Sequence, residues 1–194
     1  MLTDWNRRWR RWAAYNRVRA TIILGLAYVA FSRPYWNGLA VGTTLIAVGQ
    51  ALRFWGAGYL EKNQRLARGG PYRWVRHPLY AGSLMMGLGL SISVTHPLWW
   101  TLLYLVLFVG FFVPAIHVEE LRLQSIFGAE YQDFMVDVPA LVPRLKRRSS
   151  PPMEPTSSSF SWRRVLGNRE ARSVIAMAAL LAIQAAKILL GQGA

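Results

Sequence analysis

The stretch LYAGSLMMGLGLSISVTHPLWWTLLYLVLFVGFFVPAIHV, from Leu79 to Val118, contains no Asp, Glu, Lys or Arg. It is too long for one membrane-spanning helix, which needs about 20 apolar residues. A proline and two tryptophans within Thr95–Trp100 interrupt it, and such residues are typical of a break at the membrane interface. The stretch therefore predicts a tight hairpin of two transmembrane helices.

Further apolar segments flank this hairpin. Tyr35–Leu60 carries a single cation, Arg53, and predicts a second span of full length. Ala20–Phe31 is short and crosses a bilayer only if the arginines that precede it extend to the interface. Ser173–Leu190 is either a fifth span or a helix that lies on the bilayer. The sequence thus predicts an all-α integral membrane helical bundle with four core transmembrane helices and a fifth, C-terminal apolar helix.

Composition supports a membrane protein. The chain is 53% hydrophobic yet has a formal net charge of +14, and apolar spans joined by basic loops explain both properties. The absence of cysteine excludes disulfides and thiolate metal sites. Basic residues interleaved with tryptophan also occur in nucleic-acid binding. Here Trp5, Trp9 and Trp12 follow one helical stripe among arginines, so we expect an interfacial helix that contacts anionic lipid, and no nucleic acid.

The cations indicate an orientation. They gather in residues 1–19, 61–78 and 117–172, whereas the opposite connections carry only Arg33. The positive-inside rule then places the N-terminus and the loop before Leu79 in the cytoplasm. We expect an integral protein of the cytoplasmic membrane.

We predict four parts of the chain. Residues 1–19 form a basic amphipathic arm, and residues 20–144 form the membrane core. Residues 145–172 are a basic linker rich in proline and serine, and residues 173–194 hold the final apolar helix.

Two unusual motifs lie on the predicted cytoplasmic side. GPYRWVRHPLYAG (Gly70–Gly82) places cations, aromatic residues and prolines where a short loop would suffice. EELRLQSIFGAEYQDFM (Glu119–Met135) begins with paired acids at the end of the fourth span and reads as an amphipathic surface helix. Carboxylates at a membrane edge need partners. Two interpretations stay open: Arg73 or Arg76 only pairs with the acids and joins the helices, or the two motifs form a site.

These two motifs, in this order and followed by VPR, resemble the isoprenylcysteine carboxyl methyltransferase family and its phospholipid methyltransferase relatives. The resemblance covers about Gln50 to Arg144. It implies a membrane enzyme that uses S-adenosylmethionine, with a cofactor pocket between the RHP loop and the start of a helix at the paired acids. It also implies a lipophilic acceptor that arrives through the bilayer.

The resemblance assigns residues by position. Phe127, Gly128 and Tyr131 match the FGxxY that follows the paired acids. The G-x-G of Gly56 and Gly58 resembles one that phospholipid methyltransferases place near the cofactor, although small residues in a span also serve close packing. The cofactor-binding residues that we expect are Gly56, Gly58, Arg73, Arg76, His77, Pro78, Tyr80, Gly82, Glu119 and Glu120.

The chemistry of these side chains suits the cofactor. Arginine and histidine donors match its carboxylate, and glutamate acceptors match its ammonium or ribose hydroxyls. Tyr72, Trp74 and Tyr80 can place an aromatic face near the sulfonium. The protein must then align the methyl group with the acceptor and exclude water. We predict no metal site, because His77, His117 and Glu120 are too few ligands for one.

The sequence does not determine whether the methyl acceptor is a carboxylate or a lipid amine. A carboxylate needs only orientation, whereas an amine needs a base, for which His77 or Glu120 is available. Arg53 either steers an anionic acceptor or extends to the cytoplasmic rim. Arg53, His77 and Glu120 are thus the catalytic candidates. The alternatives are a nicotinamide-dependent sterol or steroid reductase, whose loop is similar, and a membrane anchor without catalysis.

Overall fold

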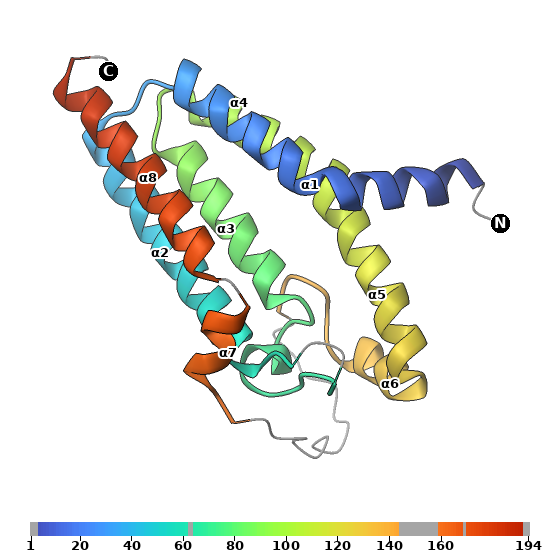
Figure 1. The fold of residues 1–194 in the computed structure, drawn as a ribbon. Coiled ribbons are helices and arrows are strands. Elements are labelled where there is room, and N and C mark those ends of the chain that lie inside the picture. The colour runs from blue at the N-terminus through green and yellow to red at the C-terminus, as the bar shows by residue number, and fades with distance from the viewer. Residues whose placement is uncertain (1–3, 62–63, 144–158, 169, 192–194) are drawn as a thin grey trace.

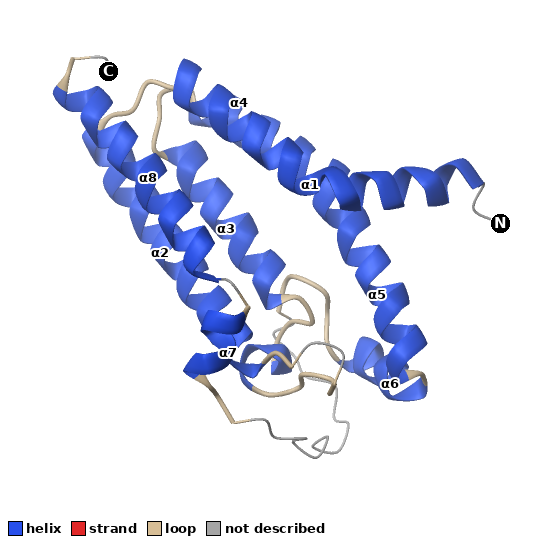
Figure 2. Cartoon of the chain, viewed as in Figure 1, coloured by secondary structure: helices blue, strands red, loops and turns tan. Residues whose placement is uncertain are grey.

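All the regular structure in the described part of the chain is helical, apart from an isolated bridge between Pro34 and Val94. The computed structural model describes residues 4–61, 64–143, 159–168 and 170–191 (Figure 1). The prediction of an all-α chain is confirmed (Figure 2). The elements are α1 (Asp4–Phe31), α2 (Trp36–Tyr59), the 3-10 helix η1 (Gly70–Arg73), α3 (Pro78–Ile92), α4 (Pro97–Leu107), the π-helix η2 (Phe108–Phe112), α5 (Val113–Phe127), α6 (Ala129–Asp137), α7 (Trp162–Gly167) and α8 (Glu170–Leu189).

Helices α2 and α3 form the most extensive contact between helices. Glycines allow it, because a Cβ atom at Gly42 would collide with the carbonyl oxygen of Gly89, and one at Gly89 with that of Gly42. Gly49 and Gly82 form a second pair of the same kind. Small residues that let backbones touch are typical of helix packing in membranes.

The end of the predicted hairpin departs from expectation. The helix does not stop near Val118, since α4, η2 and α5 form one helix from Pro97 to Phe127. The widened π turn lies just before Pro114, whose missing N–H and bulky ring do not fit a regular α turn. Glu119 and Glu120 therefore lie inside a helix and not at a helix start. The expected surface helix is divided between α5 and α6, with Gly128 at positive φ between them.

The tail adds two helices beside α2 (Figure 1). Helix α7 lies within the predicted linker, and α8 begins at Glu170, slightly before the predicted Ser173. Arg164 and Asn168 donate to backbone carbonyls at the end of α2, to Gly58 at 3.2 Å and to Ala57 at 3.0 Å. Residues 144–158, which hold Arg144 and the first half of the predicted linker, lie outside the described residues.

Among the described residues, two helices are long and apolar enough to cross a membrane, Pro97–Phe127 and Glu170–Leu189. Helix α3 is apolar but shorter. Many large apolar side chains are exposed on the outside of the bundle, among them Ile23, Phe31, Leu98 and Val106. Such extensive apolar exposure is unusual for a monomer surrounded by water.

Polar side chains attach the far end of α8 to α1. Lys187 Nζ donates to the carbonyl oxygen of Val29 at 3.0 Å and to that of Ser32, and Gln184 Nε2 donates to Ser32 Oγ at 2.9 Å. A cation near the last carbonyls of a helix also complements its dipole. The tail is thus fixed at both of its ends.

We expect Lys187→Met to lower the free energy of unfolding by about 1.5 kcal/mol, because carbonyl oxygens at the end of α1 lose a charged donor. The thermal midpoint of the detergent-purified protein should fall by about 3–6 °C. Arg172→Met on the exposed side of α8 is the control and should leave the midpoint unchanged. Equal midpoints for the two variants would contradict this role of Lys187.

Candidate active site

A polar cavity of about 630 Å³ lies between α1, the segment that precedes α3, and helices α5 and α6. Cations, acids and aromatic rings all contribute to its wall. The charged residues that line it are Arg17, Arg53, Glu61, Arg65, Arg76, Glu119 and Arg122, and the aromatic ones are Tyr72, Tyr80, Phe112, Phe127, Tyr131 and Phe134, with His77 beside them. Its volume falls in the range of small-molecule sites.

Glu120 joins the two sequence motifs behind this wall. Arg76 Nη2 donates to Glu120 Oε1 at 2.6 Å, and His77 Nε2 lies 3.3 Å from the same oxygen. The side chains of Arg76, His77 and Glu120 are only 10%, 3% and 13% exposed. Glu120 is not among the cavity-lining residues, and its carboxylate holds Arg76 and His77, which do line the cavity.

The backbone of the RHP loop is fixed by the segment after α6. The N–H of Arg76 donates to Pro139 O at 2.8 Å, and that of His77 to Ala140 O at 3.0 Å. Arg76 Nη1 also donates to Met135 O at 2.8 Å. These bonds satisfy backbone groups that a loop would otherwise leave to water, and they set the direction in which α3 begins.

Glu119 has a different position from its neighbour. It is exposed and lines the cavity, where Tyr80 Oη donates to its Oε2 at 2.8 Å. Arg17 Nη1 donates to Tyr80 Oη at 2.9 Å, and the Arg17 guanidinium lies 5.5 Å from the centre of the Tyr80 ring. Helix α1 thus supplies the cation of Arg17 to the site. The sequence had indicated this residue only as a flanking residue of the first span.

Two polar atoms at this wall have no partner among the described residues. Tyr131 Oη and Arg76 Nε are buried and form no hydrogen bond there. Tyr131 is 1% exposed, and its burial, with the negative charge of Glu120, raises the pKa of its hydroxyl above the ordinary value. Burial likewise raises the pKa of Tyr72, and Glu119 adds to that shift. Both phenols therefore stay neutral and can donate hydrogen bonds.

Not every predicted residue reaches the cavity. Arg76, His77, Pro78, Tyr80 and Glu119 line it, whereas Arg73 and Trp74 are exposed and do not.

The predicted cofactor glycines lie at helix contacts. Gly56 packs against Pro78 and Leu79 at the start of α3, and Gly58 packs against Phe160 of the tail. Gly82 contacts α2. The structure thus gives these three positions a packing role, which the sequence had offered as the alternative for Gly56 and Gly58.

Arg53 lies at the junction of the polar cavity and a second, apolar one. Its Nε and Nη2 donate to the two carboxylate oxygens of Glu170 at 2.9 and 3.0 Å. Its Nη1 donates to Ser83 Oγ at 2.6 Å and to Leu79 O at 3.1 Å. Neither sequence-based interpretation of Arg53 anticipated this ion pair, because Glu170 lay in the predicted linker.

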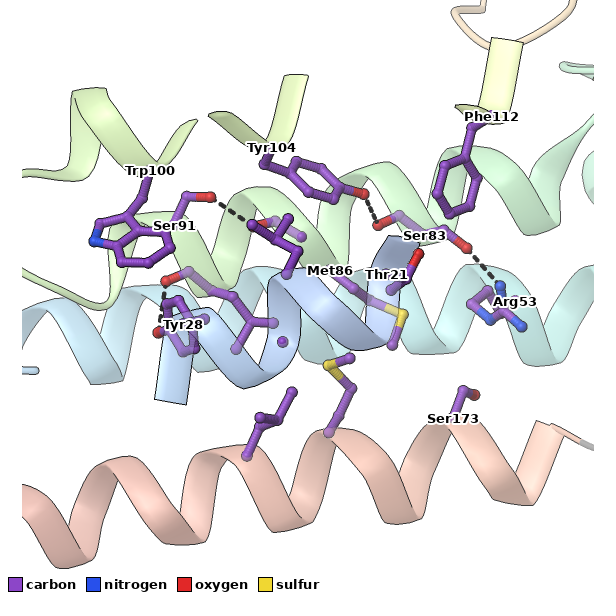
Figure 3. Close-up of a pocket in the computed structure, with 16 residues that line it drawn as sticks. Thr21, Tyr28, Arg53, Ser83, Met86, Ser91, Trp100, Tyr104, Phe112 and Ser173 are labelled. Atoms are coloured by element: carbon purple, nitrogen blue, oxygen red, sulfur yellow. Dashed lines mark hydrogen bonds between the residues drawn. The ribbon is translucent and has the colours of Figure 1, made fainter. Parts of the chain in front are cut away.

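The apolar cavity has a volume of about 200 Å³ and lies between α1, α3, α4 and α8 (Figure 3). Trp100 and Tyr28 lie at one end, with ring centroids 5.4 Å apart, and Arg53 and Ser83 lie at the other. Arg53, Ser83 and Phe112 line both cavities, so the two abut there. Phe112 belongs to the π turn, a feature that is frequent at functional sites.

Comparison with known proteins gives several matches. The family described as phospholipid methyltransferase matches residues 20–130, more than half of the chain. A cobalt-zinc-cadmium resistance protein, CzcN, of Cupriavidus metallidurans is 32% identical over 136 residues, which cover 66% of this chain and 62% of that protein. A probable protein-S-isoprenylcysteine O-methyltransferase of Oryza sativa subsp. indica is 30% identical over 123 residues, 57% of this chain and 64% of that protein.

The similarity extends to fungi. A protein-S-isoprenylcysteine O-methyltransferase of Schizosaccharomyces pombe is 31% identical over 101 residues, 52% of this chain and 42% of that protein. The chain thus spans less than two thirds of the length of these relatives. No solved structure matches it significantly. The matched range contains the RHP loop, both acids and Arg53, and the chain belongs to the family of phospholipid and isoprenylcysteine methyltransferases.

Proposed function

We propose that the protein is an integral membrane methyltransferase that uses S-adenosylmethionine and acts on a lipophilic acceptor. The observation that carries the proposal is the polar cavity, in which Arg76 and His77, held by Glu120, face Glu119, Tyr80 and Arg17. All of these residues except Arg17 lie within or beside the two sequence motifs. All but Arg17 also lie inside the family match of residues 20–130.

The donors and acceptors of the cavity fit the cofactor. The arginines suit its carboxylate, and Glu119 or Glu61 suits its ammonium. The unpartnered Tyr131 Oη suits a ribose hydroxyl, because a buried polar atom without a partner is costly and a bound ligand can supply one. When bound, S-adenosylmethionine supplies a methyl group already activated by the positive sulfur.

The residues of the chain have distinct proposed roles. His77 touches the bound molecule, and Glu120 is a positioning residue that acts through His77 and Arg76. Tyr80 and Phe112 exclude water and place aromatic faces near the positive sulfur. Arg53, at the junction of the two cavities, lies where the acceptor group meets the methyl donor.

A bilayer is the environment that suits the outside of the bundle. The helix Pro97–Phe127 and α8 are long and apolar enough to cross it. The exposed apolar side chains of α1 and α2 support further spans there, so we propose four core spans and a fifth at α8. Helix α6 and the loop before α3 lie at the same end of the molecule in Figure 1. The cations of that loop and of the N-terminal arm favour the cytoplasm for this end and contact with anionic lipid. The acceptor then reaches the apolar cavity from the membrane.

Tyr131→Phe tests the proposed ribose contact. Since Tyr131 Oη has no partner in the described protein, its removal should leave the thermal midpoint unchanged or raise it. Affinity for S-adenosylhomocysteine should fall by about tenfold, as expected for one lost hydrogen bond to a bound ligand. Tyr104→Phe is the control, because Tyr104 Oη already donates to Ser83 O at 2.8 Å outside the polar cavity. Unchanged affinity in Tyr131→Phe would remove this contact from the proposal.

Methyl transfer itself is tested in liposomes made from a total bacterial lipid extract. The protein is incubated with methyl-labelled S-adenosylmethionine, and label is measured in the organic phase. We expect labelled lipid with the wild-type protein and a strong reduction with Glu119→Gln. Folded protein that gives no label in the organic phase would contradict a lipophilic acceptor.

A further inference from the structure

Helix α1 forms part of the wall of both cavities. Arg17 and Val18 line the polar cavity, and Thr21 and Tyr28 line the apolar one. The helix packs mainly on α5 and η2, and its N-terminal end extends past α5, away from the other helices (Figure 1). The position of α1 therefore affects whatever the two cavities hold.

The first half of α1 exposes arginine and aromatic side chains on one side, which we call the outward face. Arg8, Arg11 and Arg19 are exposed there, and Trp12 and Tyr15 are 51% and 74% exposed. At 3.6 residues per turn, these five positions lie within roughly 100° of one another around the helix axis. The outward face thus combines positive charge with aromatic surface.

The chemistry of the outward face fits an anionic lipid leaflet. Aromatic rings favour the level of the headgroups, and arginines near a negative membrane surface are attracted to it. Residues 1–19 contain six arginines and a single acid, Asp4. A leaflet that carries negative charge is therefore the partner that complements both components of this face.

The opposite side of the same helix reaches the candidate active site. Ala13 is fully buried, and one turn later Arg17 Nη1 donates to Tyr80 Oη at 2.9 Å. Tyr80 Oη in turn donates to Glu119 Oε2 at 2.8 Å. Arg17 lies about 180° around the helix from Arg8 and about 14 Å along its axis. Because α1 is continuous between them, a shift of the outward face also moves Arg17.

A second contact connects the first half of α1 with the boundary between the cavities. The rings of Trp9 and Trp12 stack with their centroids 5.1 Å apart, and they lie 6.4 and 5.9 Å from the ring of Phe111. Phe111 precedes Phe112 in the π turn, and Phe112 lines both cavities. The start of α1 thus contacts the wall of the site at a second place.

We propose that the outward face of α1 binds the anionic leaflet, and that this contact strengthens cofactor binding by holding Arg17 at Tyr80. The inference rests on the proposed methyl transfer and adds its regulation by the charge of the membrane. Residues 4–19 lie outside the family match of residues 20–130. The regulation is thus a property of the N-terminal arm of this chain.

Both ligands act on the same element. A ligand shifts an equilibrium between two positions only if it binds one of them more tightly. Anionic lipid favours the position of α1 in which the outward face meets the headgroups, and the cofactor favours the position in which Arg17 completes the wall of the polar cavity. Since these are one position of one helix, each ligand should raise the affinity for the other by the same factor.

The test measures the affinity of the full chain for S-adenosylhomocysteine by calorimetry in lipid nanodiscs. One set of discs contains phosphatidylcholine alone, and the other contains phosphatidylcholine with about 30% of the anionic phosphatidylglycerol. S-adenosylhomocysteine carries one carboxylate and one ammonium, so a charged surface does not concentrate it. We expect about fivefold tighter binding in the anionic discs. The difference should disappear at about 1 M salt, where screening limits charge interactions to roughly 3 Å.

Matched variants locate the effect. The double variant Arg8→Gln/Arg11→Gln removes two exposed cations of the outward face, and Arg163→Gln/Arg172→Gln removes two exposed cations of the tail. The first should lose most of the difference between the discs, whereas the second should keep it. Arg17→Gln should bind more weakly in both discs and also lose the difference, because the cation that links the helix to the site is missing.

Three results would overturn the proposal. The first is equal affinity of the wild-type protein in both discs, and the second is a difference that persists in Arg8→Gln/Arg11→Gln. The third is an equal gain produced by inorganic phosphate in detergent, because a free ion and not the leaflet would then be the ligand. Equal binding in both discs leaves methyl transfer in place, whereas a lack of S-adenosylhomocysteine binding in every disc contradicts methyl transfer itself, and the regulation with it.

Discussion

Glu120→Gln is expected to lower the affinity for S-adenosylhomocysteine by at least about tenfold and to destabilise the protein. Arg76 Nη2 and His77 Nε2 lie 2.6 and 3.3 Å from Glu120 Oε1, and both side chains are largely buried. The loss of a charged acceptor there should cost about 2 kcal/mol. Thermal unfolding should then show a midpoint lower by about 4–8 °C, and calorimetry should show the loss of affinity.

Glu119→Gln is the matched comparison, because it makes the same change one residue away. Glu119 is exposed and faces the cavity, so its substitution should change stability by no more than about 0.5 kcal/mol. Affinity should still fall, since its carboxylate is a proposed contact of the ammonium group. Equal losses of stability in Glu119→Gln and Glu120→Gln would contradict the assignment of Glu120 as the supporting acid and Glu119 as the acid that contacts the ligand.

Gly42→Ala should strongly destabilise the protein although it adds only one methyl group. Its Cβ atom would lie against the carbonyl oxygen of Gly89 and the side chain of Ser93, so α2 and α3 have to move apart. Overpacking of this kind costs about 1–3 kcal/mol, and we expect the upper end because backbone atoms cannot rotate away. The measurement is denaturant or thermal unfolding of the purified protein.

Gly110→Ala is the control for this substitution. A Cβ atom at Gly110 would meet no atom within 4 Å, so the change should raise stability by about 0.5–1 kcal/mol through the better helix propensity of alanine. The two variants should therefore differ in sign. A neutral Gly42→Ala would show that the helices are not in close contact.

The sequence predicted which motifs meet but not how they meet. The RHP loop and the paired acids were expected at one site, and the structure brings Arg76 and His77 to Glu120. Adjacent residues on a helix point about 100° apart, so one acid had to face the cavity and the other the loop. Nothing in the sequence said which, because the position of the cavity depends on how α5 packs against α1.

Other features depend on contacts between distant residues. Arg53 and Glu170 are far apart along the chain, and no local pattern connects them. Arg17 looked like a flanking residue of a short span, whereas the continuous helix α1 brings it to Tyr80. The helix also did not end at Glu119 where hydropathy fell, because backbone hydrogen bonds continue a helix through charged residues when one face still packs.

The G-x-G of Gly56 and Gly58 shows the limit of a short motif. Residues two apart on a helix point in nearly opposite directions. Gly56 therefore packs on α3 while Gly58 packs on Phe160 of the tail. Both glycines have a packing role in the structure, and a contact of either one with a cofactor stays a prediction.

Calorimetry with S-adenosylhomocysteine, beside NADPH, on the detergent-purified wild-type protein tests the central claim most directly. We expect micromolar binding of S-adenosylhomocysteine, weaker binding in Glu119→Gln and Glu120→Gln, and no binding of NADPH. Folded protein that binds NADPH, or that does not bind S-adenosylhomocysteine, would contradict the claim that the cavity formed by Arg76, His77 and Glu119 holds a methyl donor.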